Sequence, residues 1–181
     1  MPLEVKSKPS PSICSKYNAT YHKEGNKEYC AVLTNNYLLL DGPFVESFDN
    51  RPYLTGYYSK GKKDGCWYLI RRDGTINVEA EYSKGELVGR YKEYYSNGKL
   101  AIVELYENGK RQGVSYEFSS RGLITKMRTF DNGILQGLSK NYHSNGIVKS
   151  VGSYFEGKKC GEWRQYNVEG KLIYHEEFND C

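Results

Sequence analysis

Apolar and polar residues alternate in short runs along most of the chain, and turns that contain glycine separate the runs. From Gly65 onward the alternation repeats every 24 residues, with copies that start at Gly65, Gly89, Gly113, Gly137 and Gly161. A fixed period between about 20 and 50 residues is typical of a repeat array. Each copy holds two runs of period-two alternation bounded by turn residues, so the pattern predicts one β-hairpin per copy.

Counted from the leading glycine, the repeat keeps glycine at positions 10 and 21 and an apolar or aromatic residue at positions 6, 12 and 18. We expect structural roles for these residues, which include Gly74, Gly98, Gly109, Gly122, Gly133, Gly146, Gly170, Tyr94, Tyr106, Phe130 and Tyr154. Residues directly opposite in a hairpin share a face of the sheet. Parity therefore predicts three-residue loops, at Ser96-Asn97-Gly98 and at Glu107-Asn108-Gly109. Positions 6, 12 and 18 would then form one packed face.

The predicted fold is all-β: a repeat array of antiparallel β-hairpins that forms an elongated, twisted, mostly single-layer sheet. Residues 65–181 hold five in-register copies, the last one truncated, and residues 16–64 are expected to be a degenerate N-terminal cap with the first repeats. Residues 1–15 are rich in Pro and Ser, and we expect a flexible tail there. The composition agrees with a thin sheet, because 18 Tyr stand against 6 Phe and a Tyr ring can pack while its hydroxyl stays in water.

The distribution of charge argues against a nucleic-acid-binding protein, and the absence of common catalytic motifs argues against most classes of enzyme. The 26 basic residues are interleaved with 22 acidic ones, whereas nucleic-acid binders usually cluster their basic residues. No P-loop, G-x-S-x-G or HExxH motif occurs. His22, His143 and His175 lie far apart in the sequence, without the spacing of a metal site. We therefore expect no catalytic residue, no metal and no cofactor.

The five cysteines lack the spacing of a zinc site. The simpler interpretation is that they are free thiols in a cytoplasmic protein, since the chain shows no signal peptide. The alternative is a Cys14–Cys30 disulfide, which would imply an oxidising periplasmic or extracytoplasmic compartment reached after removal of a signal.

The repeat resembles the MORN (membrane occupation and recognition nexus) repeat, in its bacterial variant. The residues that carry the resemblance are Tyr94, then Asn97-Gly98-Lys99-Leu100, Tyr106 and Asn108-Gly109-Lys110, and the likeness covers about residues 42–181. Proteins of this variant include antitoxins of the YwqK type and immunity-like proteins that accompany toxins. The resemblance implies a protein-binding role, with a toxin or effector as partner. It carries over no catalytic position.

If positions 6, 12 and 18 form a packed face, the other face of the sheet is left for recognition. The candidate protein-binding residues are Trp67, Arg71, Arg90, Tyr91, Tyr95 and Trp163, since Trp, Tyr and Arg dominate binding hot spots. The competing interpretation is that the position 3 aromatic residues are core. A membrane-surface scaffold is the second function class, and its lysines would be Lys60, Lys62, Lys63, Lys158 and Lys159.

Overall fold

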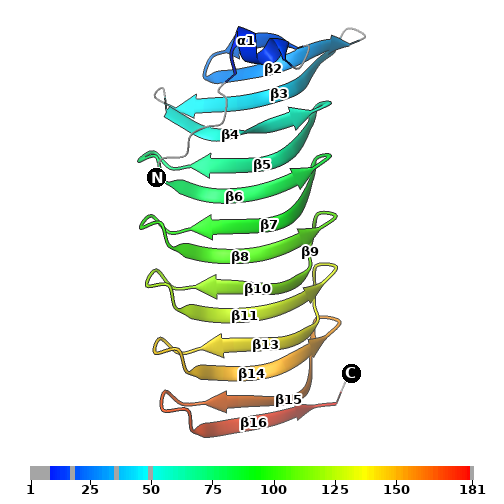
Figure 1. Ribbon diagram of the computed structural model, residues 1–181. Helices are drawn as coiled ribbons and strands as arrows, with labels where there is room; N and C mark the ends of the chain where they lie inside the picture. The colour runs from blue at the N-terminus through cyan, green and yellow to red at the C-terminus, as the bar shows by residue number, and fades with distance from the viewer. Residues whose placement is uncertain (1–8, 17–18, 35–36, 49–50, 180–181) are drawn as a thin grey trace. The chain divides into compact units, whose positions relative to one another are not determined.

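The computed structural model describes residues 9–16, 19–34, 37–48 and 51–179. This part of the chain is nearly all antiparallel β, with sixteen strands in one open sheet (Figure 1), and fourteen of them lie side by side in chain order while two short strands pair off this path. The all-β hairpin class is thereby confirmed. Contacts divide the chain into two compact units, Met1–Gly89 and Arg90–Cys181, and each is described by itself.

The first unit contains one short helix and six strands, and the boundary between the two units falls within a seventh strand. They are α1 (Pro11–Ser15), β1 (Thr20–Glu24), β2 (Lys27–Thr34), β3 (Tyr37–Phe48), β4 (Arg51–Ser59), β5 (Lys62–Ile70), β6 (Ile76–Ser83) and β7 (Glu86–Tyr94). The second unit continues with β8 (Leu100–Glu107), β9 (Lys110–Arg111), β10 (Gly113–Phe118), β11 (Ile124–Asp131), β12 (Ile134–Leu135), β13 (Gly137–Tyr142), β14 (Val148–Phe155), β15 (Lys158–Tyr166) and β16 (Leu172–Phe178).

The hairpin loop after position 6 has the predicted three residues. Around Ser96-Asn97-Gly98, the Tyr95 amide donates to the Lys99 carbonyl at 2.8 Å and the Gly98 amide donates to the Tyr95 carbonyl at 2.9 Å. Gly98 has a φ of 77°, a left-handed conformation that favours glycine. In a neighbouring copy Phe118 pairs with Ile124. Positions 6 and 12 therefore share a face, as parity predicts.

The prediction for the second loop of each copy is wrong. Glu107 pairs with Lys110 and Tyr106 pairs with Arg111, which leaves a two-residue turn of Asn108 and Gly109. Their φ values are 50° and 74°. Two left-handed residues in succession form a type I′ turn, whose twist matches that of the flanking strands. The turn therefore follows the local preference of the Asn-Gly pair and not the loop length that parity predicted.

A β-bulge corrects the predicted face of position 18. Glu117 pairs with Lys126, but the next residue, Phe118, pairs with Ile124, so Thr125 is an extra residue in β11. The same shift recurs between Asn141 and Tyr142. Because one extra residue reverses the alternation, positions 14, 16 and 18 lie on the face of positions 1, 3 and 5. Positions 6 and 12 lie on the opposite face.

We call the face of positions 1, 3, 5, 14, 16 and 18 the ladder face, and it carries the core. In the first unit its buried residues are Tyr29, Ala31, Phe44 and Trp67, with Leu40, Leu54, Tyr58 and Tyr82 packed against them. In the second unit Phe130 and Trp163 are buried. A cationic side chain from position 23 covers three of these rings: Lys63 over Trp67 at 4.3 Å, Arg111 over Phe130 at 4.4 Å and Lys159 over Trp163 at 4.7 Å.

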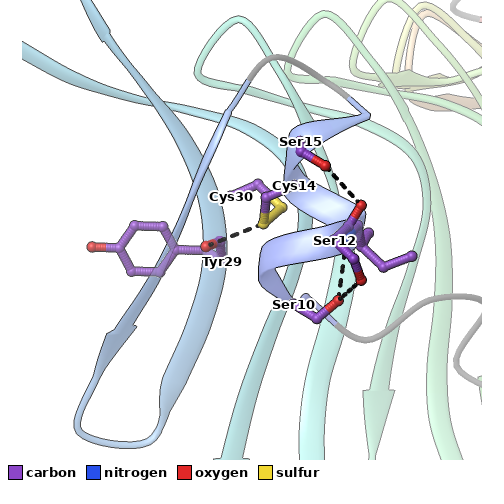
Figure 2. The surroundings of a disulfide bond; sticks show 7 residues. Ser10, Ser12, Cys14, Ser15, Tyr29 and Cys30 are labelled. Carbon is purple, nitrogen blue, oxygen red and sulfur yellow. Dashed lines mark hydrogen bonds between the residues drawn. A yellow bond between two sulfur atoms is a disulfide. The ribbon is translucent and has the colours of Figure 1, made fainter.

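A disulfide joins α1 to β2 (Figure 2). The helix begins after Ser10, whose hydroxyl accepts a hydrogen bond from the Ile13 amide at 3.2 Å, and Pro11 stands in its first turn. Cys14 is bonded to Cys30, and both are buried. Residues 11–15 are thus an ordered helix rather than the flexible tail that composition predicted. Cys160 is also disulfide-bonded, so the interpretation of all cysteines as free thiols is wrong.

Candidate binding surface

The face opposite the ladder carries an apolar surface in the second unit, and we call it the open face. Its paired strand residues from 90 to 153 are Arg90, Lys92, Tyr94, Leu100, Val103, Leu105, Glu107, Lys110, Val114, Tyr116, Phe118, Ile124, Met127, Thr129, Asp131, Ile134, Leu138, Lys140, Tyr142, Val148, Val151 and Ser153. Leu105, Val114, Ile134 and Leu138 are exposed, and the other apolar residues are half-buried. All described elements of the second unit belong to the sheet, so none of them forms a second layer over this face.

The open face is basic as well as apolar. Between residues 90 and 153 its paired strand positions hold four basic residues, Arg90, Lys92, Lys110 and Lys140, and two acidic residues, Glu107 and Asp131, next to the two-residue turns. The other acidic strand residues of the same stretch, Glu93, Glu104 and Glu117, belong to the ladder face, where Glu117 pairs across the strands with Lys126 at 2.8 Å. Because the basic residues outnumber the acidic ones, an apolar ligand that carries negative charge complements the open face.

The two tryptophans predicted to bind a partner lie in the core. Trp67 is 2% exposed and Trp163 is 8% exposed. The Trp163 indole lies on Gly152, its ring is 5.1 Å from the Tyr154 ring, and its Nε1 donates to the Ser153 carbonyl at 3.1 Å. The premise that these rings are free on the second face is wrong, because the bulge places position 3 with position 18.

The other four predicted residues divide between the two faces and the loops. Tyr91 packs on Tyr106, with ring centroids 5.9 Å apart. The Tyr95 hydroxyl donates to the Phe118 carbonyl at 2.7 Å, which ties neighbouring hairpins together. Arg71 donates to the Ile76 carbonyl at 2.6 Å. Of the six, Arg90 alone is exposed on the open face.

Burial and neighbouring carboxylates raise the pKa of two tyrosines on the ladder face, Tyr91 and Tyr106, so both stay protonated. The Tyr106 hydroxyl donates to Glu104 at 2.8 Å, and burial, followed by this hydrogen bond, raises the pKa of Tyr106 to about 12. Burial and a 2.6 Å hydrogen bond to Glu93 also raise the pKa of Tyr91. These groups stabilise the sheet as hydrogen-bond donors and are not poised to accept a proton.

Sequence reasoning missed the open face as a unit. Val103, Leu105, Met127 and Val151 occupy odd positions, and the parity argument grouped them with the position 3 aromatic residues. The bulge separates the two sets, and it places Tyr116 beside Val103. The signal was present at positions 2, 4 and 6 of the copies that start at Gly89, Gly113 and Gly137, which hold no acidic residue, but the rest of the face could be assigned only once the bulge was known.

The described residues contain no group of three or more His, Cys, Asp or Glu side chains placed to hold a metal ion. None of the described helical segments has the length and apolar character needed to cross a bilayer. Comparison with known protein families found no family model that matches the chain, and no curated protein matches its sequence.

Proposed function

We propose that the chain is a non-catalytic binding protein that neutralises a protein partner by stoichiometric association, as an antitoxin or immunity protein does. The observation that carries the proposal is the open face, which presents apolar and aromatic side chains together with four basic residues. Uncovered apolar surface on a folded unit is typical of an interaction site. The resemblance to the bacterial MORN variant supports a toxin or effector as the partner.

The test is co-expression with the product of each reading frame adjacent to the gene, followed by size-exclusion chromatography with light scattering. We expect a complex of defined stoichiometry with one of these products. Arg90→Glu on the open face should weaken it about tenfold, as a change in an interface of complementary charge does. Lys84→Glu, in an exposed turn of the first unit, is the matched control and should leave it unchanged. Equal affinities for the two variants would remove the open face from the interface.

A membrane-surface scaffold is the second candidate, because a basic apolar face also suits anionic lipid. Co-sedimentation with phosphatidylserine vesicles at low and physiological salt tests it. Vesicle binding that persists at physiological salt, together with failure of every adjacent gene product to bind, would favour the scaffold. Absence of sedimentation would support the protein-binding proposal over it.

The disulfides support an oxidising compartment as the place of action. The Cys14–Cys30 bond is buried, and disulfides persist mainly in extracytoplasmic spaces. We infer that the protein acts there rather than in the cytoplasm, and thiol alkylation of the native protein in cells checks this. Labelling of Cys66 alone among Cys14, Cys30 and Cys66 is the expected result.

A further inference from the structure

The open face is hollowed near the end of the second unit. A groove of about 350 Å³ is lined by Lys140, Ile147, Val148, Val151, Tyr166 and Gly170. Small-molecule sites usually span about 300–1,000 Å³, so this volume suits one side chain or ring and not a large cofactor. Five of the six lining residues are uncharged, and Lys140 supplies the charge.

Substitutions between neighbouring copies explain why the groove is here. The preceding copy has Tyr116 and Met127 at the positions of Lys140 and Val151. The Tyr116 ring lies 6.3 Å from the Phe118 ring, so that copy fills its own surface with aromatic groups. At the groove, Lys140 and Val151 stand where the preceding copy has a tyrosine and a methionine. The lysine side chain is flexible and the valine side chain is shorter than that of methionine, so space is left between the copies.

The charge of the groove identifies what can enter it. None of the ion pairs among the described residues involves Lys140. An ammonium group beside an apolar hollow favours a ligand whose apolar group lies next to a carboxylate, because the ammonium can pair with the carboxylate while the apolar group leaves water. The next hairpin carries Glu162 and Glu177 on the same face, and Glu162 already pairs with Arg164.

We propose that the groove receives an aromatic or leucine-sized side chain of the protein partner, from a segment in which an Asp or Glu is adjacent and pairs with Lys140. This inference rests on the proposed function and names the chemistry of its partner. A partner segment fits better than a free metabolite, since the groove belongs to a wider apolar and basic face along which a chain can continue. Hot-spot side chains of protein interfaces occupy such hollows.

The test uses a small probe, so that it needs no identified partner. The ¹⁵N-labelled full chain is titrated with N-acetyl-Phe-Asp-amide and followed by NMR. The expected result is shifts at the amides of Val151 and Gly170, with a Kd of about 1–10 mM for a ligand of this size. N-acetyl-Phe-Asn-amide should bind about two- to fivefold more weakly, the range of an exposed ion pair. Absence of shifts at the groove, or equal binding of the two probes, would overturn the proposal.

Two variants assign the binding to the groove. Val151→Met installs the residue of the preceding copy, so the fold should be kept, as a thermal melt would verify, while probe binding is lost. Lys140→Glu should reverse the preference from N-acetyl-Phe-Asp-amide to N-acetyl-Phe-Lys-amide. Lys84→Glu is the matched control, since Lys84 lies in an exposed turn of the first unit and does not line the groove, and it should change the Kd less than twofold. Unchanged binding by a folded Val151→Met protein would contradict the inference.

The proposal for the groove and the proposed function can be disproved separately. Probe binding without a complex with any adjacent gene product would leave the groove chemistry in place and remove the proposed function. A complex that forms equally well with Val151→Met and Lys140→Glu would keep the function and remove the groove from the interface.

Discussion

Ser115 and Ser139 occupy the position that Trp67 and Trp163 hold in other copies. The Ser115 hydroxyl donates to Glu104 at 3.4 Å. The Ser139 hydroxyl is buried, with the residue 1% exposed, and has no hydrogen-bond partner among the described residues. A buried unpaired hydroxyl destabilises a fold, whereas a paired one does not.

Ser139→Ala should therefore raise the free energy of unfolding by about 1 kcal/mol, because it removes a hydroxyl that loses its hydration on folding and forms no hydrogen bond in the folded state. Ser115→Ala is the matched variant one copy earlier and should lower the stability or leave it unchanged. Urea denaturation of the two variants measures the difference. A loss of stability in Ser139→Ala equal to that in Ser115→Ala would show that the Ser139 hydroxyl is paired.

The ladder tyrosines predict a decline of stability at alkaline pH. The pKa of Tyr106 rises from 10.0 to about 12 on folding, so the folded state keeps a proton that the unfolded chain has released. The resulting stability is complete below pH 10 and is lost as the pH rises toward 12. Tyr106→Phe should flatten the fall of melting temperature across this window. Parallel curves for the two proteins would count against a protonated Tyr106.

At the scale of the hairpin, glycine spacing predicted the three-residue loop, because Gly98 and its equivalents stand where a left-handed residue is required. The two-residue turn was missed although Asn108-Gly109 is a pair that favours it, because the parity argument assumed strands without a bulge. The extra Thr125 was equally invisible, because the bulge depends on how β10 and β11 pair. Errors in the face assignment, and hence in the binding site, followed from these two features.

The type I′ turn gives a direct check of the corrected hairpin. Asn108→Val should cost about 1–3 kcal/mol, because a β-branched residue is strained at a φ of 50°. Asn108→Gly should be tolerated, since glycine accepts this conformation. Ser96→Val in the three-residue loop, where no positive φ is required, is the control, and its cost should be smaller. Chemical denaturation of all three variants ranks them.

At the scale of the whole molecule, the disulfide fixes α1 to the first unit. The Cys14–Cys30 bond closes a loop with a sequence separation of 16, and a loop of this length contributes about 3 kcal/mol. The double variant Cys14→Ser/Cys30→Ser should lose protection of β2 and β3 amides from hydrogen exchange, while β13 to β15 keep theirs. Cys66→Ser, which removes an exposed free thiol, should change neither. Equal loss of protection in β13 to β15 would show that the units do not unfold separately.

Much of the fold was readable from the chain because the period of 24 residues fixes both the strands and their glycine turns. The order within the N-terminal segment was not readable, since α1 depends on a disulfide that spacing alone leaves open. The site was only partly readable for a different reason. Trp67 and Arg90 look alike as candidates for binding in the sequence, and only the packing of Trp67 on Gly56 separates them.

The contact between tryptophan and glycine also bears on how such an array can change by duplication. Trp163 lies on Gly152 and Trp67 lies on Gly56, and an added Cβ at either glycine would clash with the indole ring. Ser115, by contrast, faces the bulky Glu104 of the copy before it. Each copy is thus fitted in size to its predecessor, so loss or gain of one 24-residue unit would bring together partners of the wrong size. The number and order of copies are inherited as a set, although every copy has the same fold.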